Sequence, residues 1–274
     1  MSIKLICIDM DGTLLKDQQT VSDNNKEAIK EAIKRGVHIA ITTGRVYDCA
    51  KMYSKEIGLN TPIISSNGAF IGGSNGEVIY NNPLNIEELN KFYNVTKKYG
   101  LMAYLTTNFG VVSDEELPEN HVYNVLNKKL SDDEKIRIET FNDINIALRE
   151  YDGQILKGVC VEKNHKDKLH KARKELESLN SNMEIVASWD DNFEIMEKGS
   201  TKGDAVKKLA EYFNISREEV MCIGDSENDL SMIEYAGIGV AMGNAIEKVK
   251  VSADYITDRN INDGVAKAIK KFVL

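Results

Sequence analysis

The chain has 274 residues, of which 42% are hydrophobic, and a formal net charge of -8 at pH 7. This length suits one large domain or two modest ones with an ample core. The sequence pI of about 5.2 argues against nucleic acids and anionic membranes as the main partners.

The cysteines and the apolar runs indicate a cytoplasmic protein. The four cysteines form no CxxC pair and no metal-ligand spacing, and Cys7 and Cys222 lie within apolar runs. Buried thiols in a reducing compartment are therefore expected. Asp9 and Asp11 interrupt the first apolar run too early for a signal peptide. No stretch approaches the ~18 apolar residues of a membrane span.

Short apolar runs alternate with amphipathic segments from the start of the chain. Strands are predicted at residues 5–8, 37–42 and 62–65. One helix is predicted between Ser22 or Asp23 and Gly36, and another at residues 46–57. This βαβαβ order predicts a parallel sheet with right-handed crossovers. Residues 70–71 and 78–80 flank the glycine-rich segment 72–76, a pattern typical of a β-hairpin.

The pattern changes after Asn82-Pro83. The following region is predicted to contain helices at about 86–99, between about 119 and 150, and at about 165–179. Its strands are predicted at 102–106, 110–112, 155–161, 183–187 and 193–196. Paired strands followed by helices indicate an α+β module. From Thr201 the alternation of helices and strands resumes. We therefore predict a parallel-sheet α/β core formed by residues 1–82 and 189–274, with residues 83–188 inserted as a second domain and the two termini close together.

Two carboxylates follow the first predicted strand, in the segment Asp9-Met10-Asp11-Gly12-Thr13. Open α/β sheets bind ligands at the carboxyl ends of their strands. One carboxylate could serve as a nucleophile and metal ligand while the other transfers a proton. Taken alone, the segment could equally be a turn, because Asp and Gly favour turns.

A second acidic strand end lies more than two hundred residues away. The apolar run 220–223 leads into Gly224-Asp225-Ser226-Glu227-Asn228-Asp229. A calcium loop of the helix-loop-helix kind is excluded because its sixth position, which requires Gly, is Leu230 and no Glu occupies the twelfth. Hard oxygen ligands on two strands suit Mg²⁺, which uses few carboxylates and keeps waters.

Two further segments favour an anionic ligand. Thr43 offers a hydroxyl and Gly44 an amide at the start of the next predicted helix. Lys202 lies in the first turn of the helix predicted after Thr201, where the helix dipole disfavours cations unless an anionic partner is present. The alternative for Lys202 is an ordinary surface lysine.

In this order the four segments resemble the motifs of the haloacid dehalogenase superfamily of aspartyl phosphotransferases, and in particular its Cof-like branch of sugar-phosphate-type phosphatases. The resemblance covers residues 1 to about 82 and about 189 to 274. Further matching segments are Ser66-Asn67-Gly68-Ala69, Val240-Ala241-Met242-Gly243-Asn244-Ala245, Ala253-Asp254-Tyr255-Ile256-Thr257 and Asn262-Asp263-Gly264-Val265. The resemblance implies an α/β Rossmann-like core with an inserted cap domain, and a Mg²⁺-dependent phosphatase of small phosphate monoesters.

The resemblance also implies a role for each site residue. Asp9 would be the nucleophile that forms an aspartyl-phosphate, and Asp11 the general acid and base. Mg²⁺ would be held by Asp9, Asp225 and the main-chain carbonyl of Asp11. The phosphoryl group would bind Thr43, Lys202, Asn228 and the amides of Met10 and Gly44. Asp229 would orient Lys202 or a metal-bound water, and Asn67 would form a turn or help to shape the site.

Two other functions stay open: a phosphomutase with the same aspartyl-phosphate chemistry, and a non-catalytic sensor of phosphorylated metabolites. Arg45 could reach phosphate or join an ion pair. Lys157 is a single candidate in the insert for contacting an anionic substrate, and the lack of a dense basic patch there favours neutral polyol or sugar monophosphates. We expect Trp189 to pack at a hinge. The substrate and the oligomeric state are not determined by these patterns.

Overall fold

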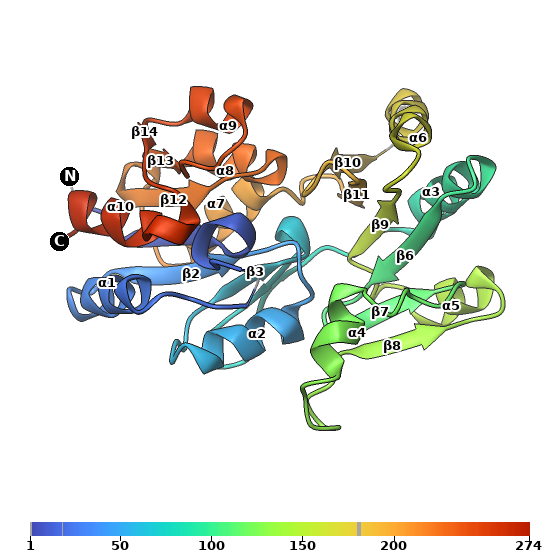
Figure 1. The fold of residues 1–274 in the computed structure, drawn as a ribbon, viewed down its shortest axis with the longest axis horizontal. Helices are drawn as coiled ribbons and strands as arrows, with labels where there is room; N and C mark the ends of the chain where they lie inside the picture. The colour runs from blue at the N-terminus through green and yellow to red at the C-terminus, as the bar shows by residue number, and fades with distance from the viewer. Residues whose placement is uncertain (1, 18, 180–181) are drawn as a thin grey trace. The chain divides into compact units, whose positions relative to one another are not determined.

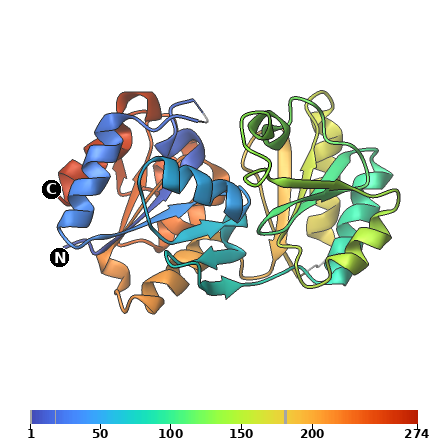
Figure 2. The same ribbon diagram turned by 90° about the horizontal axis from the view of Figure 1, so that it is seen from below.

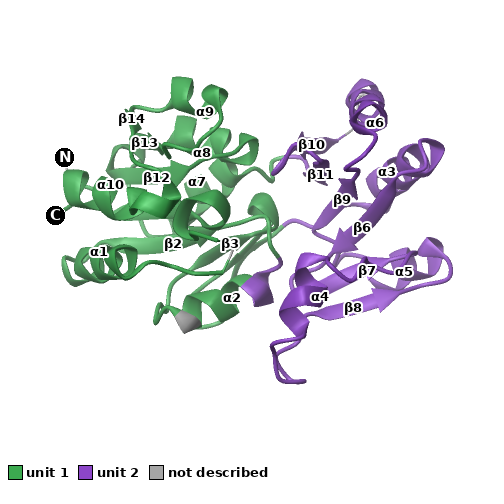
Figure 3. Ribbon diagram, in the orientation of Figure 1, with its two compact units in different colours: residues 1–45, 50–81, 199–274 green, residues 46–49, 82–198 purple. Residues whose placement is uncertain are grey.

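The computed structural model describes residues 2–17, 19–179 and 182–274 of the chain (Figure 1). The chain divides into two compact units (Figure 3). Unit 1 comprises residues 1–45, 50–81 and 199–274, and unit 2 comprises residues 46–49 and 82–198. No helix among the described residues is both long enough and apolar enough to cross a membrane.

The described part of unit 1 is built on an eight-stranded sheet with the order β14-β13-β12-β1-β2-β3-β4-β5. Neighbouring strands from β14 to β3 are parallel, whereas β4 and β5 are antiparallel to their neighbours. Its strands are β1 (Leu5–Asp9), β2 (His38–Thr42), β3 (Ile63–Ser65), β4 (Phe70–Gly72), β5 (Val78–Asn81), β12 (Val220–Gly224), β13 (Ile238–Ala241) and β14 (Tyr255–Ile256). The predicted parallel-sheet core and the hairpin are both present.

The helices of the chain's first and last parts cover this sheet. They are α1 (Asp23–Lys34), α2 (Tyr47–Glu56), α7 (Lys202–Tyr212), α8 (Leu230–Tyr235), α9 (Glu247–Ser252) and α10 (Gly264–Phe272). Helix α1 packs on β2 and against α10, whereas α7 and α8 pack against each other over other strands. Right-handed crossovers place α1 and α8 on opposite faces, because the chain runs outward from β1 in one direction and from β12 in the other. Strand β1 is therefore completely buried.

Both ends of the chain belong to unit 1. The chain's start, from Ser2, and its C-terminus lie at the same end of this unit, as expected (Figures 1 and 2). Arg35, which follows α1, donates hydrogen bonds to the carbonyl oxygens of Val273 and Leu274. The C-terminal residues are thus tied to the end of the first helix.

Unit 2 has a six-stranded sheet among its described residues, with the order β10-β11-β9-β6-β7-β8. Its strands are β6 (Met102–Thr106), β7 (Gly110–Ser113), β8 (Arg137–Thr140), β9 (Lys157–Val161), β10 (Met183–Val186) and β11 (Asn192–Glu197), and its helices are α3 (Ile86–Lys98), α4 (Val122–Asn127), α5 (Ile144–Glu150) and α6 (Lys166–Ser178). Helices α3 and α6 pack together against strands of the sheet.

Three details differ from the sequence prediction. Helices were expected between residues 119 and 150, but strand β8 lies between α4 and α5 because it pairs with β7 at the edge of the sheet. We expected the chain to return to the core at residue 189, but unit 2 extends to Lys198. The reason is that β11 pairs with both β9 and β10 and so completes the sheet of unit 2. Trp189, which was expected to pack at a hinge, is 52% exposed.

Candidate active site

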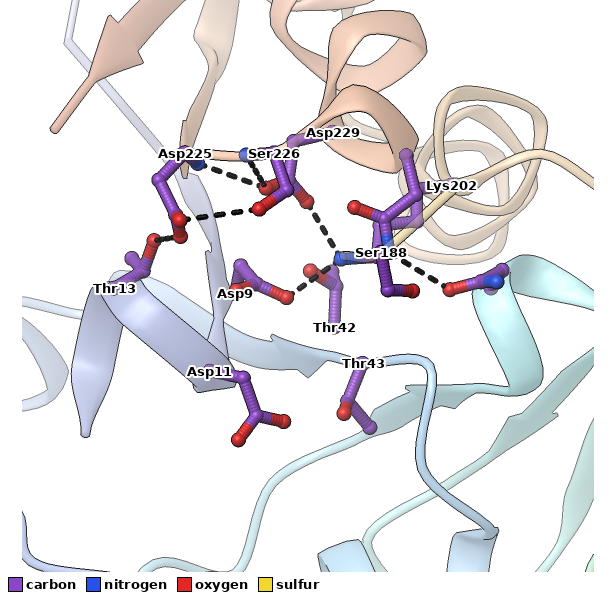
Figure 4. Close-up of polar contacts among 12 residues, drawn as sticks. Asp9, Asp11, Thr13, Thr42, Thr43, Ser188, Lys202, Asp225, Ser226 and Asp229 are labelled. Atoms are coloured by element: carbon purple, nitrogen blue, oxygen red, sulfur yellow. Dashed lines mark hydrogen bonds and ion pairs between the residues drawn. The ribbon is translucent and has the colours of Figure 1, made fainter. Parts of the chain in front are cut away.

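A buried lysine and two buried carboxylates meet at the carboxyl end of β1 (Figure 4). Asp9 is the last residue of β1 and is 5% exposed. Lys202 is the first residue of α7, as predicted, and its side chain is completely buried. Its Nζ lies 2.5 Å from Asp9 Oδ1 and 2.5 Å from Asp229 Oδ1. The lysine therefore bridges the two carboxylates.

Asp229 also fixes the loop that carries Asp225. Its Oδ2 accepts hydrogen bonds from the main-chain amides of Asp225, at 2.8 Å, and Ser226, at 2.9 Å. Both oxygens of Asp229 are thus occupied, one by Lys202 and the other by the amides. Asp229 was expected to orient either Lys202 or a metal-bound water, and in the structure it contacts Lys202.

Asp225 is held by two hydroxyl groups. Thr13 Oγ1 donates to Asp225 Oδ1 at 2.6 Å, and Ser226 Oγ donates to Oδ2 at 3.1 Å. Sequence reasoning missed both residues. Thr13 is the last residue of the Asp9-to-Thr13 segment that the sequence analysis singled out. Its contact with Asp225 was missed because the two residues are 212 positions apart. Gly12, with φ of +80°, brings the turn so close to Asp225 that an added Cβ would lie 2.5 Å from the carboxylate.

Burial and mutual repulsion perturb these groups. Burial raises the pKa of Asp9 well above its ordinary value, and the Asp229 carboxylate raises it further, although Lys202 opposes this. Burial and then the Asp229 carboxylate raise the pKa of Asp225 to about 7. Burial by itself would lower the pKa of Lys202, but Asp229 and Asp9 raise it above its ordinary value. Lys202 is therefore charged at neutral pH. Its single positive charge does not offset the burial and mutual repulsion of the neighbouring carboxylates.

A divalent cation would supply the positive charge that these carboxylates need to be ionised together. One carboxylate oxygen from each of Asp9, Asp225 and Asp229 lies within 4.8 Å of the other two. Carboxylate oxygens are suitable ligands for Mg²⁺, and a cation would favour the ionised carboxylates against the burial and the repulsion that raise the two pKa values. Asp229 is already paired with the ammonium group of Lys202 and with two main-chain amides, whereas the oxygens of Asp225 accept from the neutral hydroxyl groups of Thr13 and Ser226. Asp225, together with Asp9 at the end of β1, therefore forms the better pair of ligands. This is also the pair of carboxylates predicted from the sequence.

Asp11 has a different partner. Its two oxygens accept hydrogen bonds from Arg45, at 2.9 Å from Nε and 2.6 Å from Nη2. The guanidinium lies over the Tyr53 ring, with Cζ 4.9 Å from the ring centroid. Figure 4 shows the Asp11 carboxylate turned away from the Asp9 carboxylate. Arg45 was expected either to reach phosphate or to join an ion pair, and the structure shows the ion pair.

The residues after β2 form a turn and not the start of a helix. Thr43 is buried, and its Oγ1 accepts a hydrogen bond from the Arg45 amide at 3.1 Å. Helix α2 begins only at Tyr47, so the expectation that Gly44 lies at a helix N-terminus is wrong. Met10 begins the turn after β1, and its carbonyl oxygen accepts from the Leu15 amide at 2.9 Å.

Asn67 and Asn228 contact each other, although they are far apart in the sequence. Asn228 Nδ2 donates to Asn67 Oδ1 at 3.0 Å. Asn67 lies in a turn with φ of +56°, next to Gly68 with φ of +107°. A Cβ on Gly68 would lie 2.2 Å from the Thr201 carbonyl oxygen. The turn therefore packs directly on the residue that caps α7, one position before Lys202.

Known proteins resemble this chain over its whole length. A family model described as haloacid dehalogenase-like hydrolase matches residues 6–269. The chain is 36% identical to the 5-amino-6-(5-phospho-D-ribitylamino)uracil phosphatase YcsE of Bacillus subtilis (strain 168), over 100% of this chain and 97% of the relative. It is 33% identical to phosphatase YwpJ of the same organism, over 98% of this chain and 99% of the relative.

Solved structures share the fold. A haloacid dehalogenase-like hydrolase from Bacillus subtilis matches with a TM-score of 0.87 at 29% identity, covering 99% of this chain and 100% of the other. A sugar phosphatase of HAD subclass IIB matches with a TM-score of 0.78 at 26% identity, covering 98% of each chain.

Proposed function

The chain belongs to the phosphatases of the haloacid dehalogenase-like hydrolase family, and we propose that it hydrolyses small phosphate monoesters with Mg²⁺ through an aspartyl-phosphate on Asp9. The observation that carries this proposal is the contact of Asp9 with the fully buried, positively charged Lys202. A cation held beside a carboxylate at a strand end attracts an anionic phosphoryl group and places it next to a nucleophile.

The first step transfers the phosphoryl group to the protein. A carboxylate oxygen of Asp9 attacks phosphorus, the bond from phosphorus to the ester oxygen breaks, and Asp11 gives its proton to the departing alcohol. In the second step Asp11 takes a proton from water, the water oxygen attacks phosphorus, and phosphate leaves Asp9. Lys202 and Thr43 neutralise and hold the phosphoryl oxygens in both steps, together with Asn228 and the amides of Met10 and Gly44.

Arg45 is paired with Asp11 before the first step. Both Asp11 oxygens accept hydrogen bonds from Arg45. A protonated Asp11 is neutral and its hydroxyl oxygen is a weaker acceptor, so protonation of Asp11 weakens its contact with Arg45. The ion pair describes the state in which Asp11 is ionised.

The metal site would use Asp9, Asp225 and the main-chain carbonyl of Asp11. Bound Mg²⁺ supplies positive charge that reduces the repulsion between a phosphate ester and the Asp9 carboxylate. Thr13 and Ser226 hold the Asp225 carboxylate in place, and Asp229 fixes its main chain.

The substrate class is a phosphorylated metabolite of modest size. Relatives of this chain are phosphatases of a ribitylaminouracil phosphate and of sugars, and we extend this class of ester to the chain itself. Because the residues around Asp9 recognise only phosphate, residues 82–198 of unit 2 are proposed to act as the cap that recognises the alcohol part of the ester. A cap that closes over the site would also exclude water until the alcohol departs.

The test is phosphate release from p-nitrophenyl phosphate. Turnover should require Mg²⁺, stop with EDTA and return when Mg²⁺ is added in excess. Asp9→Asn should abolish it, since the nucleophile and a metal ligand are lost together, whereas the exposed Asp132→Asn should match the wild type. Activity of Asp9→Asn near the wild-type level, or no effect of EDTA, would refute the proposal. Transfer of phosphate within a sugar phosphate, without release, would indicate the phosphomutase instead.

A further inference from the structure

Three segments of unit 1 follow the carboxyl ends of neighbouring parallel strands. The turn 10–15 follows β1, the loop 225–229 follows β12, and residues 242–246, which we call the bridge segment, follow β13. Strand β12 lies between β1 and β13, so the bridge segment is separated from the turn after β1 by one strand. The bridge segment carries none of the residues proposed to hold the phosphoryl group or the metal.

The main chain of the bridge segment is bound to the neighbouring strand end. The Met242 amide donates to the Gly224 carbonyl oxygen at 3.0 Å, and the Ile246 amide donates to the Asp225 carbonyl oxygen at 3.0 Å. These two hydrogen bonds lie on either side of Asn244 in the sequence. The main chain around Asn244 is therefore fixed relative to the main chain of Asp225.

The side chain of Asn244 reaches the more distant turn. Its Nδ2 donates to the Gly12 carbonyl oxygen at 2.8 Å, across 232 positions of sequence. Asn244 Oδ1 accepts from the Asn260 main-chain amide at 2.9 Å, so the amide group has its acceptor on one side and its donor on the other. Asn260 Nδ2 donates in turn to the Leu15 carbonyl oxygen at 2.9 Å. The two asparagines therefore hold the middle and the end of the turn 10–15.

Gly12 is also the residue at which this turn comes close to Asp225. A Cβ on Gly12 would lie 2.5 Å from Asp225 Oδ2, and the adjacent Thr13 donates to Asp225 Oδ1 (Figure 4). Glycine has the least restricted backbone of all residues, so a hydrogen bond from outside the turn has a large effect on its conformation here. Because peptide units are planar, a fixed Gly12 carbonyl also restricts the direction of the preceding Asp11 carbonyl.

We propose that Asn244 is a positioning residue that sets the spacing between Asp225 and the turn 10–15, and that this spacing favours Mg²⁺ over the larger Ca²⁺. The inference rests on the proposed function, in which Asp225 and the main-chain carbonyl of Asp11 hold the metal. Mg²⁺ requires near-ideal octahedral geometry with ligands at about 2.0–2.1 Å, whereas Ca²⁺ accepts flexible geometry at about 2.3–2.6 Å. A less firmly held turn therefore weakens Mg²⁺ binding more than Ca²⁺ binding.

The experiment measures cation binding directly, without substrate. MgCl₂ and CaCl₂ are titrated separately into the wild type and Asn244→Ala in a calorimeter, and the result is the ratio of the Kd for Ca²⁺ to the Kd for Mg²⁺. Asn244→Ala should lower this ratio by about 3- to 10-fold, the effect of one hydrogen bond. A loss of folded protein alone would lower the number of binding sites and leave the ratio unchanged.

The matched control is Asn25→Ala. Asn25 is completely buried in unit 1, and its Oδ1 accepts from the Ala266 amide at 2.9 Å, which ties α1 to α10. This variant also loses an asparagine hydrogen bond to a distant main-chain group, but that bond joins two helices and does not reach the turn 10–15. Asn25→Ala should unfold at lower urea concentration than the wild type and keep the ratio of the two Kd values within about twofold.

A second variant of the same size as the original side chain covers the case in which Asn244→Ala does not fold. Asn244→Asp still accepts from the Asn260 amide but turns an oxygen, not a donor, toward the Gly12 carbonyl oxygen. Its added negative charge attracts both divalent cations alike, so the ratio of the two Kd values isolates the effect of geometry. The ratio should fall in this variant as well.

Two outcomes would overturn the inference: a ratio in the folded Asn244 variants within twofold of the wild type, or an equal fall of the ratio in Asn25→Ala. Failure of the proposed function is seen in a different measurement. In that case the wild type releases no phosphate from p-nitrophenyl phosphate in the presence of Mg²⁺, whatever the ratio of the two Kd values.

Discussion

The free energy of unfolding is predicted to depend on pH through His121. It caps α4 with its side chain, since Nδ1 accepts a hydrogen bond from the Tyr123 amide at 3.4 Å. Its ring also packs edge-on against Tyr104, with ring centroids 5.1 Å apart. Burial lowers the pKa of His121 from 6.5 to about 4. A protonated imidazole could not accept the capping bond, so the folded protein favours the neutral ring.

The sign and size of the effect follow from linkage. Between the folded pKa near 4 and the unfolded pKa near 6.5 the unfolded state binds more protons, so stability falls as pH decreases through this window. The loss attributable to His121 is about 1.4 kcal/mol at pH 5.5 and approaches about 3 kcal/mol near pH 4. Above pH 7 the same residue contributes almost no pH dependence.

Urea unfolding at pH 7.5, 6.5, 5.5 and 4.5 measures this loss. His121→Gln keeps a capping oxygen but removes the titrating group, so its free energy of unfolding should decline less steeply than that of the wild type between pH 6.5 and 4.5. His170→Gln, at an exposed position of α6 in the same unit, is the control and should follow the wild type. Parallel pH profiles for the wild type and His121→Gln would refute the reasoning.

The remaining predictions concern the candidate active site. Thr13→Val should raise the Mg²⁺ concentration for half-maximal turnover at pH 6 by about 10-fold or more, because the 2.6 Å hydrogen bond from Thr13 favours the ionised Asp225. The control is Thr42→Val, which changes a buried threonine whose hydroxyl contacts a methionine sulfur. A Mg²⁺ concentration within twofold of that for Thr42→Val would contradict this. Asp11→Asn should lower turnover by ~10²–10⁴-fold, with phosphoenzyme formation from an aryl phosphate suffering less than that from a sugar phosphate, and equal losses would count against a proton-transfer role. Gly68→Ala should lower the thermal midpoint and the turnover together, since its Cβ would collide with the carbonyl oxygen before α7, and an unchanged midpoint would show that the turn adjusts freely.

Local sequence patterns were sufficient to predict the fold class and the positions of the charged groups along the chain. A buried parallel strand is recognisable because both of its faces need apolar side chains, and this placed Asp9 and Asp225 at strand ends. The helix predicted after Thr201 likewise placed Lys202 in a first helical turn, as the structure shows. These features depend on neighbours within a few residues, so they can be read from the sequence directly.

Pairing between distant segments was decided only by the tertiary structure. Thr13 meets Asp225 because β1 and β12 are neighbouring strands in one register, and Arg45 meets Asp11 because β2 is the neighbour on the other side. The same holds in unit 2, where the register of β9 and β11 places Glu194 opposite Val159, within reach of Lys157 two residues away on β9. The pairing of β11 also extends the unit to Lys198. The sequence by itself determined the strands and helices around the candidate active site, whereas strand β8 in unit 2 was not predicted. Which side chains then neutralise one another depends on strand order and register, which arise from packing across the whole chain and leave no local pattern.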